Sequence, residues 1–508
     1  MGPHCQGDLG NATTISFYGG VHEIGGNKFL VEDKGTRLFL DFGMQMGKVN
    51  QYYSEYLQPR DLNGMGDLFE YGLLPRLKGL YRQDYAKHSS YGDEREETAF
   101  NAVLLTHAHL DHAAYIHYLR PDIPIYCTEA TKLVLQTLED TGSDEEYLTY
   151  KESFKLYRNS RGELSRATSA ENRLEVARPI NLIESTKKFN IDSIEVEPVA
   201  IDHSIPGVSA FILHTSKGSV ACTADIRFHG RRKADSERFL ERCASSDLDY
   251  LLCEGTRIAE TNSKTELDVE LEVKAIVGKT SQLVVCTYPP RDLDRLLSFY
   301  KAAVESGRDL VVDLKQAYLL RLFQGSDALK GSYPRPDDKH IKIYLPKKSW
   351  GLIGKDVAVW SKKQRDTDYK TWEREFLDFG NAVNCQDVAS GQKGMVYYCS
   401  DYALQNLIDI RPEKGSSYVR SSTEPFDDEM KFDEERVKRW IMHFGLISKE
   451  GEWNHVHVSG HGDGTQLKRV IEESRPKCLI PIHTEHEEYH KKWHKNVQIV
   501  ELNQSIAI

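Results

Sequence analysis

The stretch THAHLDH, residues 106–112, gathers three of the chain's 19 histidines and one aspartate directly behind an apolar run, AVLL. Alternate residues that leave a strand project to one side, so His107 and His109 can bind the same metal ion. Asp111 and His112 come one turn later and point at a neighbouring position, which predicts ligands for two metal ions rather than one. The alternative is a polar surface loop, which we disfavour for this pattern at the end of an apolar strand.

The composition excludes several classes of protein. Of 508 residues, 28% are charged and 40% hydrophobic, and the formal net charge is -11, as in ordinary soluble globular proteins. No run of 18 apolar residues is present and the N-terminal residues lack signal-peptide character, so neither a membrane span nor secretion is expected. Nine cysteines without a CxxC pair disfavour a disulfide framework and indicate a reducing cytoplasm. Without a basic tail, a nucleic-acid partner has to be bound by a local patch or by metal ions.

The order of the expected strands and helices indicates one domain interrupted by another. The first part is strand-rich and includes a hairpin of KFLVED and TRLFLDFG across the turn DKG. The middle alternates strands such as QLVVCTY and RDLVVDL with helices such as RDLDRLLSFYKAAVES, which is typical of a parallel sheet. Histidine-bearing strand ends then return. We therefore predict a first domain made of residues 1–262 and 445–508, interrupted by an inserted domain at residues 263–444.

Further candidate ligands follow other predicted strands. His203 follows the strand in IEVEPVAIDHSIPG, Asp225 ends VACTADI, and His483 ends KCLIPIHTE. Each alone is weak evidence, because polar residues at strand ends are commonly turn formers. Together they place histidines and aspartates at the ends of successive strands, where α/β sheets build their sites. A carboxylate at Asp225 could bridge two metal ions.

This ordered set resembles the metallo-β-lactamase superfamily, whose motifs are matched by Asp41 in LFLDFG, then HAHLDH, His203 and Asp225. The resemblance implies an α/β fold of the αββα sandwich type. It also implies two zinc ions with these ligands: His107, His109 and His203 for one, Asp111, His112 and His483 for the other, and Asp225 as a bridge. Asp41 would orient the ligands from behind, since metal-bound histidines usually need a second hydrogen-bond partner. A turn aspartate after a strand is the alternative for Asp41.

The stretches HVHVSGHGDG and RPKCLIPIHTE look like the β-CASP branch of that superfamily, and most like ribonuclease J and its archaeal relatives. The carboxylate motif of this branch is matched by Glu254 in LLCEGT, the second motif by His461 and the third by His483. DNA-processing members carry an aliphatic residue at the third motif, so His483 points to RNA. By resemblance, residues 263–444 would be the inserted parallel-sheet β-CASP domain.

The resemblance implies a zinc-dependent ribonuclease that degrades single-stranded RNA in the cytoplasm. We expect 5′-to-3′ hydrolysis from 5′-monophosphate ends, with endonuclease activity in addition. Mn²⁺ or Mg²⁺ could substitute for zinc, and the chain could form a homodimer. The catalytic residues would be Asp111, Glu254 and His461, with His461 as general acid beside Glu254; a structural histidine in a glycine-rich turn is the alternative for His461. The loop residues that would hold a substrate phosphate are His457, Ser459 and Gly460.

Three features depart from the family pattern. Residues 46–98 form a longer connection than usual, GTRI follows Glu254, and the chain ends at Ile508. The separate C-terminal domain of many bacterial ribonuclease J proteins is therefore expected to be missing. The long connection interleaves tyrosines with basic residues, which suits single-stranded RNA, but we favour a self-packed loop with a dimer contact.

Two other functions stay open. A small-molecule hydrolase of the same superfamily, of thioesterase or lactonase type, is the main alternative. The HVSGH loop, Glu254 and the inserted domain favour the nuclease, because small-molecule members lack them. A degenerate RNA-binding scaffold is disfavoured, because every metal-ligand position is filled.

Overall fold

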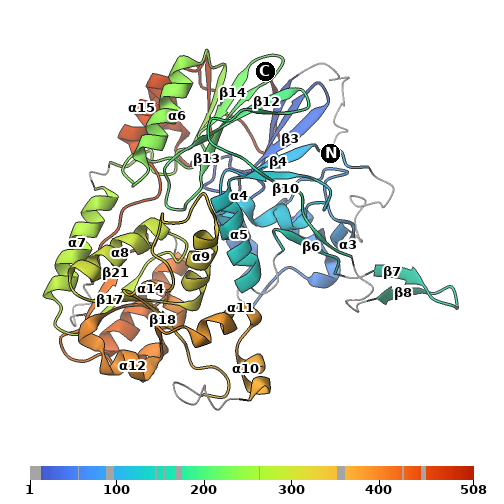
Figure 1. Cartoon of the computed structure of the whole chain (residues 1–508). Helices are drawn as coiled ribbons and strands as arrows, with labels where there is room; N and C mark the ends of the chain where they lie inside the picture. Colours follow the sequence, from blue (N-terminus) through green and yellow to red (C-terminus); the bar gives the residue numbers. More distant parts are fainter. Residues whose placement is uncertain are drawn as a thin grey trace.

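The structure, a computed structural model, describes residues 13–54, 56–86, 97–142, 146–153, 155–167, 174–261, 264–351, 361–425, 428–447 and 453–508. Two β-sheets form a sandwich, and a third sheet with its own helices lies beside it (Figure 1). This arrangement confirms the α/β class expected from the sequence.

The first sheet of the sandwich has seven strands in the order β10-β5-β4-β3-β2-β1-β24. They are β1 (Thr14–Phe17), β2 (Phe29–Asp33), β3 (Thr36–Leu40), β4 (Ala102–Leu104), β5 (Ile125–Cys127), β10 (Ile180–Leu182) and β24 (Ser505–Ala507). The predicted hairpin is confirmed, because β2 and β3 pair antiparallel from Phe29 opposite Leu40 to Asp33 opposite Thr36. β4 runs parallel to β3 and β5, and the chain leaves it into residues 106–112.

The second sheet has six strands in the order β11-β12-β13-β14-β15-β23. They are β11 (Phe189–Ile191), β12 (Ile194–Ala200), β13 (Ser209–His214), β14 (Ser219–Cys222), β15 (Tyr250–Cys253) and β23 (Cys478–Pro481). β14, β15 and β23 are parallel to one another. Their carboxyl ends therefore meet at one edge, where Asp225, Glu254 and His483 follow.

Alternating side chains build two core layers. Phe211 and Leu213 of β13 share one apolar cluster with Leu38 and Leu40 of β3, which joins the two sheets face to face. Ile212 belongs to a second cluster that includes residues of α6 and α15. Because successive strand residues point to opposite faces, each sheet is covered on both sides, as in an αββα sandwich. The helices of this domain are α4 (Leu110–Ala113), η2 (Ala114–Tyr118, a 3₁₀ helix), α5 (Glu129–Thr141), α6 (Lys233–Ser245), α15 (Gly464–Ser474) and α16 (Glu487–Trp493).

The inserted region builds a separate parallel sheet in the order β19-β18-β17-β20-β16-β21-β22. Its strands are β16 (Val284–Thr287), β17 (Asp309–Val312), β18 (Ile341–Tyr344), β19 (Ala382–Val383), β20 (Met395–Tyr398), β21 (Ser417–Arg420) and β22 (Asn454–His455). Its α-helices are α7 (Glu266–Lys279), α8 (Leu293–Glu305), α9 (Leu314–Gly325), α10 (Lys362–Asp368), α11 (Thr371–Arg374), α12 (Cys385–Ser390), α13 (Asn406–Ile410) and α14 (Asp428–His443). The predicted alternation of strands and helices in a parallel sheet is confirmed.

The boundaries of the inserted domain stay a prediction. The first lies at residues 262–263, which are outside the described residues. The second was expected after residue 444, but β22 comes later and still pairs with β21 of the inserted sheet. The chain therefore adds one short strand to the inserted sheet before it returns to the sandwich.

The long connection at residues 46–98 is largely packed against the sandwich. It contains α1 (Met46–Tyr52), the 3₁₀ helix η1 (Asp61–Asn63), α2 (Gly66–Glu70) and α3 (Gln83–Ala86), and residues 87–96 lie outside the described part. Leu68, Phe69 and Tyr81 are buried in the core, which supports the self-packed interpretation. Tyr52 and Tyr71 stack with ring centroids 4.0 Å apart and remain 41% and 40% exposed. Contacts of this surface with RNA or a second chain stay predictions.

Two small antiparallel strand pairs lie outside the three large sheets. In one pair, β6 (Thr149–Lys151) runs antiparallel to β9 (Glu175–Ala177), and between them in the chain β7 (Lys155–Arg158) and β8 (Leu164–Ala167) form a hairpin that projects from the body (Figure 1). Across the described ranges, no helix is both long and apolar enough to span a membrane. The eight cysteines in these ranges are buried and unpaired, in line with their scattered positions.

Candidate metal centre

All seven predicted metal ligands converge at the edge where strands of both sheets end. The positions are His107 and His109 after β4, Asp111 and His112 in α4, His203 after β12, Asp225 after β14, and His483 after β23. Their ligand atoms form two groups, and within each group all atoms lie within 4.8 Å of one another. The members are His107, His109, His203 and Asp225 in the first group, and Asp111, His112 and His483 in the second. For the six histidines and aspartates other than Asp225 this division matches the one that the family resemblance implies, and the bridging role of Asp225 stays a prediction.

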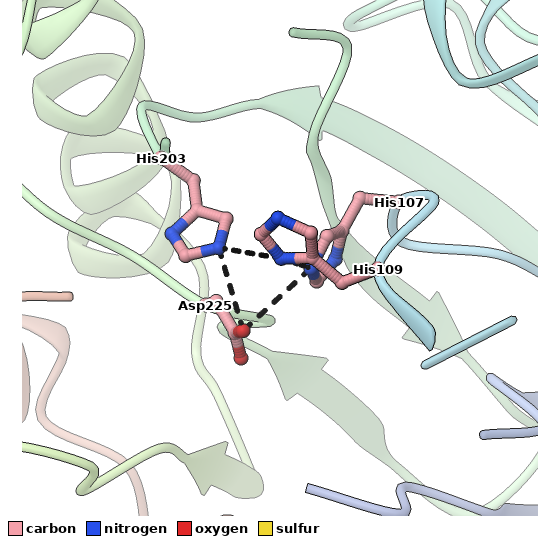
Figure 2. A group of neighbouring side chains, drawn as sticks. All are labelled: His107, His109, His203 and Asp225. Atoms are coloured by element: carbon pink, nitrogen blue, oxygen red, sulfur yellow. Dashed lines mark hydrogen bonds and ion pairs between the residues drawn. The ribbon is translucent and has the colours of Figure 1, made fainter. Parts of the chain in front are cut away.

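In the first group, three imidazoles and one carboxylate point at a common position (Figure 2). His109 Nδ1 lies 3.0 Å from His107 Nε2 and 3.1 Å from His203 Nε2. Asp225 Oδ2 lies 3.6 Å from the same two Nε2 atoms. Burial lowers the pKa of His109 to about 4 and the pKa values of His107 and His203 well below the ordinary value. These rings are therefore neutral and offer lone pairs, as zinc ligation requires.

The second group contains one carboxylate, Asp111, and the Asp225 carboxylate of the first group adjoins it. His483 Nε2 lies 3.3 Å from Asp111 Oδ2, and His112 Nε2 lies 3.1 Å from Asp225 Oδ2. Burial favours neutral rings here too, but the carboxylates outweigh it and raise the pKa of His483 to about 9. Without a metal ion, such a site binds a proton at the position that a metal cation would take. Within the described residues, the buried His112 Nε2 and Asp225 Oδ1 make no hydrogen bond, so both are left for a ligand.

Asp41 hydrogen-bonds to His112 of this group on the side of the ring away from the ligand atom. Its carboxylate accepts hydrogen bonds from His112 Nδ1 at 2.7 Å, from the Thr106 backbone N–H at 2.7 Å and from the Thr106 hydroxyl at 2.8 Å. The bond to Nδ1 leaves His112 Nε2 to face Asp225. Asp41 adopts a left-handed backbone with φ of 58°, and His483 does so with φ of 51°. Strained non-glycine residues of this kind are characteristic of functional sites.

A glycine makes the close packing around Asp111 feasible. A Cβ atom on Gly43 would lie 1.7 Å from the backbone oxygen of Asp111. The LDFG motif therefore brings its own backbone against the first turn of α4, and only glycine fits this approach.

Two further contacts orient the remaining histidines. His203 Nδ1 donates to the backbone oxygen of Gly460 at 2.5 Å, and His483 Nδ1 donates to the Thr256 hydroxyl at 2.8 Å. In both rings Nε2 is left facing the ligand groups. Thr256 was missed by the sequence analysis, although it lies in the GTRI stretch that departs from the family pattern. An isolated threonine in a turn carries no pattern that would have identified it.

Glu254 and His461 lie side by side next to the ligand groups. His461 Nδ1 is 3.1 Å from Glu254 Oε2, and the buried carboxylate also accepts from the Ile226 N–H at 2.8 Å and from the Thr256 hydroxyl at 2.7 Å. Burial would lower the pKa of His461, but Glu254 and Asp225 outweigh it and raise the pKa. The imidazolium form is thereby favoured, and its Nε2 is free of Glu254.

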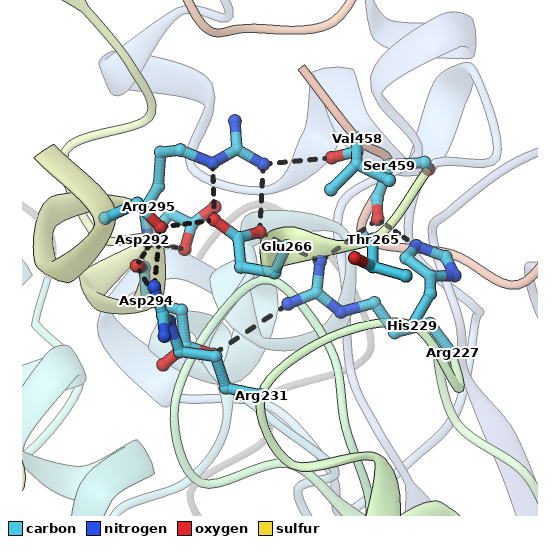
Figure 3. Close-up of polar contacts among 12 residues, drawn as sticks. Arg227, His229, Arg231, Thr265, Glu266, Asp292, Asp294, Arg295, Val458 and Ser459 are labelled. Carbon is cyan, nitrogen blue, oxygen red and sulfur yellow. Dashed lines mark hydrogen bonds and ion pairs between the residues drawn. The ribbon is translucent and has the colours of Figure 1, made fainter. Parts of the chain in front are cut away.

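The predicted phosphate-binding residues contact other parts of the protein. The Ser459 carbonyl accepts from His229 Nε2 at 2.8 Å and from Arg227 Nη1 at 3.1 Å (Figure 3). The Ser459 hydroxyl accepts from the His461 N–H at 3.0 Å. His457 Nδ1 lies 3.1 Å from Arg295 Nη1. Burial and the Arg295 charge lower the pKa of His457 to about 2. Binding of a phosphate by this loop stays a prediction.

A buried ion network holds this loop against the inserted domain. Arg295 makes two hydrogen bonds to Glu266, at 2.8 Å and 3.1 Å, and donates to the Val458 carbonyl at 3.1 Å (Figure 3). Both ionic side chains are fully buried. The network was not predicted, because nothing in the sequence relates charged residues on helices α7 and α8 to the glycine-rich loop.

Comparisons with known proteins give one match to the last part of the chain and other matches over most of its length. A family model described as the Zn-dependent metallo-hydrolase RNA specificity domain matches residues 449–496. Ribonuclease J of Pyrococcus abyssi is 23% identical over 503 residues, which cover 94% of this chain and 90% of the relative. Ribonuclease J of Sinorhizobium meliloti is 21% identical over 393 residues, or 76% of this chain. The chain spans 57% of the length of the latter relative.

A solved structure matches nearly the whole chain. It is a protein of unknown function from Enterococcus faecalis, with a TM-score of 0.68 and 22% identity, and the match covers 98% of this chain and 100% of that one. At this identity the likeness concerns the fold alone.

Proposed function

We propose that this chain, a ribonuclease J-like protein of the β-CASP branch of the metallo-β-lactamase superfamily, hydrolyses phosphodiester bonds of RNA with the help of zinc. The observation that carries the proposal is the pairing of Glu254 with His461 beside the two ligand groups. Expulsion of a ribose 3′-oxygen calls for a proton donor close to the metals. The protonated His461 meets this need.

The ligand chemistry fits two zinc ions per chain. The proposed ligands are His107, His109 and His203 for one ion, Asp111, His112 and His483 for the other, and Asp225 between them. When bound, the ions would activate a water molecule as the nucleophile and offset negative charge on the phosphate. Mn²⁺ accepts the same nitrogen and carboxylate ligands, whereas Mg²⁺ prefers oxygen. Mn²⁺ is therefore the better substitute of the two.

The protein's own groups move the protons. His461 would donate the proton on Nε2 to the 3′-oxygen as the P–O bond breaks, while Glu254 keeps the ring charged and oriented. Asp111, whose side chain is 23% exposed, would take up the proton that the attacking water loses. The products are a 3′-hydroxyl and a 5′-phosphate.

The proposed substrate is single-stranded RNA degraded from its 5′ end, with internal cleavage in addition. Buried, unpaired cysteines support a reducing compartment such as the cytoplasm. Assembly into a homodimer stays a prediction.

The test combines metal analysis with 5′-labelled RNA. We expect about two zinc ions per chain and RNA cleavage that a chelator abolishes and added zinc restores. Asp111→Ala and His112→Ala should remove cleavage and keep the melting temperature, because each deletes a ligand and leaves the sandwich core. Asp327→Ala, at a 98% exposed side chain, is the matched control.

The alternative is a thioesterase or lactonase of the same superfamily. It would be favoured by hydrolysis of thioesters or lactones without cleavage of RNA by the zinc-loaded protein. Full RNA cleavage after complete metal removal, or by Asp111→Ala, would overturn the site assignment.

A further inference from the structure

Arg291 is the arginine in the loop between β16 and α8, and no acidic side chain in the described part of the chain forms an ion pair with it. It is half-buried, and its Nε atom is buried without a hydrogen bond within the described residues. Two other arginines nearby are paired: Arg295 with Glu266 at 2.8 Å and Arg232 with Asp294 at 2.9 Å. Buried guanidinium groups are normally paired, because removing their charge from water is costly.

The loop that carries Arg291 is held against the metal centre. Asp294, in the first turn of α8, bonds to Arg232, and Arg232 donates to the backbone oxygen of the metal ligand His203 at 2.9 Å. On the next residue, Arg295 reaches the Val458 carbonyl, just before the Ser459 loop (Figure 3). The start of α8 is therefore fixed between His203 and that loop.

The charge of Arg291 affects the pKa of one of the proposed metal ligands. Burial is the main cause of the low pKa of His109, and the Arg291 charge lowers it further. Burial lowers the pKa of Arg291 itself, and Tyr147, from the sandwich, and Tyr398, from the inserted sheet, oppose this shift. Arg291 stands directly before α8, whose first turn is tied through Arg232 to the backbone of His203 in the first ligand group.

We propose that Arg291 binds a phosphate group of the RNA next to the phosphate that is cleaved. The proposal rests on the function proposed above. The guanidinium fork matches phosphate oxygens with two parallel hydrogen bonds, and an anion would supply the missing partner charge. The inserted domain would in this way hold the substrate strand across the metal centre with a residue of its own.

This role predicts opposite effects on stability and on binding. Replacing a half-buried charge whose Nε atom lacks a partner by a methionine of similar length removes part of a desolvation cost, so Arg291→Met should melt at the same temperature as the wild type or higher. A purely structural arginine would instead lose stability on this change. RNA binding should weaken at the same time.

The binding experiment uses Asp111→Ala protein with zinc in the buffer, a background that keeps the RNA intact. The probe is a short, 3′-labelled single-stranded oligoribonucleotide, and the dissociation constant is measured against salt concentration. Adding Arg291→Met should raise the dissociation constant about tenfold to a hundredfold. It should also reduce the slope of log affinity against log salt by about 0.7, the value for one phosphate contact on a single strand. Arg291→Lys should keep the slope, and Arg436→Met, at a 69% exposed side chain, should change neither quantity.

A neutral linkage locates the contacted phosphate. One methylphosphonate placed beside the scissile linkage should weaken binding to Asp111→Ala protein and have no further effect once Arg291→Met is added. Equal losses with and without Arg291, or an unchanged salt slope in Arg291→Met, would overturn the subsite while leaving RNA hydrolysis by the wild type untouched. Conversely, weakened RNA binding by Arg291→Met in a protein that cleaves no RNA would retain the subsite and reject the proposed reaction.

Discussion

His461 Nδ1 lies 3.1 Å from the carboxylate of Glu254, although 207 residues separate the two in the chain. Glu254 follows β15 of the sandwich, whereas His461 comes after the whole inserted sheet. The pair forms only when the chain returns from the insertion and docks its glycine-rich loop beside the metal ligands. The proposed proton donor therefore depends on how the two domains are joined.

The first prediction tests proton donation by His461. His461→Gln should slow cleavage of ordinary RNA by about 10²- to 10⁴-fold, the usual contribution of a general acid. A linkage with sulfur in place of the 3′-oxygen should be cleaved with far less loss, because a thiolate leaves without a proton. Single-turnover rates on the two linkages provide the measurement. An equal loss on both would assign His461 to binding or to structure instead.

The second prediction concerns Asp41. Asp41→Asn keeps the size of the side chain and removes the charge that orients His112, so zinc affinity should fall about 10- to 100-fold. Competition with a chromophoric chelator measures this. Asp33→Asn is a matched control, because Asp33 is also buried on the same hairpin but bonds to Thr13 and Ser216, away from the ligands. Equal zinc affinities for the two variants would contradict a supporting role for Asp41.

The third prediction concerns the buried pair of Arg295 and Glu266. Arg295→Met or Glu266→Gln alone should lower the free energy of unfolding by about 3–5 kcal/mol, because each leaves an uncompensated buried charge or polar partner. The double variant should lose clearly less than the sum of the two losses. Denaturant unfolding of the three variants gives the coupling. Additive losses would mean that the ion pair contributes nothing beyond its separate contacts.

An exposed ion pair gives the reference for this comparison. Arg335 pairs with Asp337, and both side chains are at least 46% exposed. Arg335→Met should therefore change the free energy of unfolding by no more than about 0.5 kcal/mol.

Local patterns were enough to predict most of the framework. The hairpin of β2 and β3 follows from its turn and its apolar runs, and the inserted parallel sheet follows from alternating strands and helices. The strand β24 was not expected, because Ser505–Ala507 is too short to carry a pattern and is defined only by pairing with β1. A strand was expected at NHVHVSGH, where β22 lies, but its pairing with β21 of the inserted sheet was not, because two residues carry no signal of their partner.

The site divides in a similar way. Histidines and aspartates at strand ends can be predicted because the strands themselves can, and the ends of parallel strands share an edge. Thr256 and Arg291 could not be predicted, since their roles rest on contacts between segments far apart in the sequence. For Gly460, the contact of its carbonyl with His203 was not expected, and the predicted donation to a phosphate stays a prediction.

The last prediction concerns the polarity of degradation. If the loop at Ser459 holds a terminal phosphate, the span from that phosphate to the metals fixes the bond that is cut, and mononucleotides leave stepwise from the 5′ end. A triphosphate carries more charge and bulk than a pocket for one phosphate can accommodate, so 5′-monophosphate RNA should be degraded faster. Ser459→Ala and His457→Ala should reduce this preference more than they slow internal cleavage, while Ser245→Ala on the exposed face of α6 should not. Product size is followed over time on 5′-labelled RNA with either end. Long internal fragments appearing first, whatever the 5′ group, would make the protein chiefly an endonuclease and exclude the terminal-phosphate pocket.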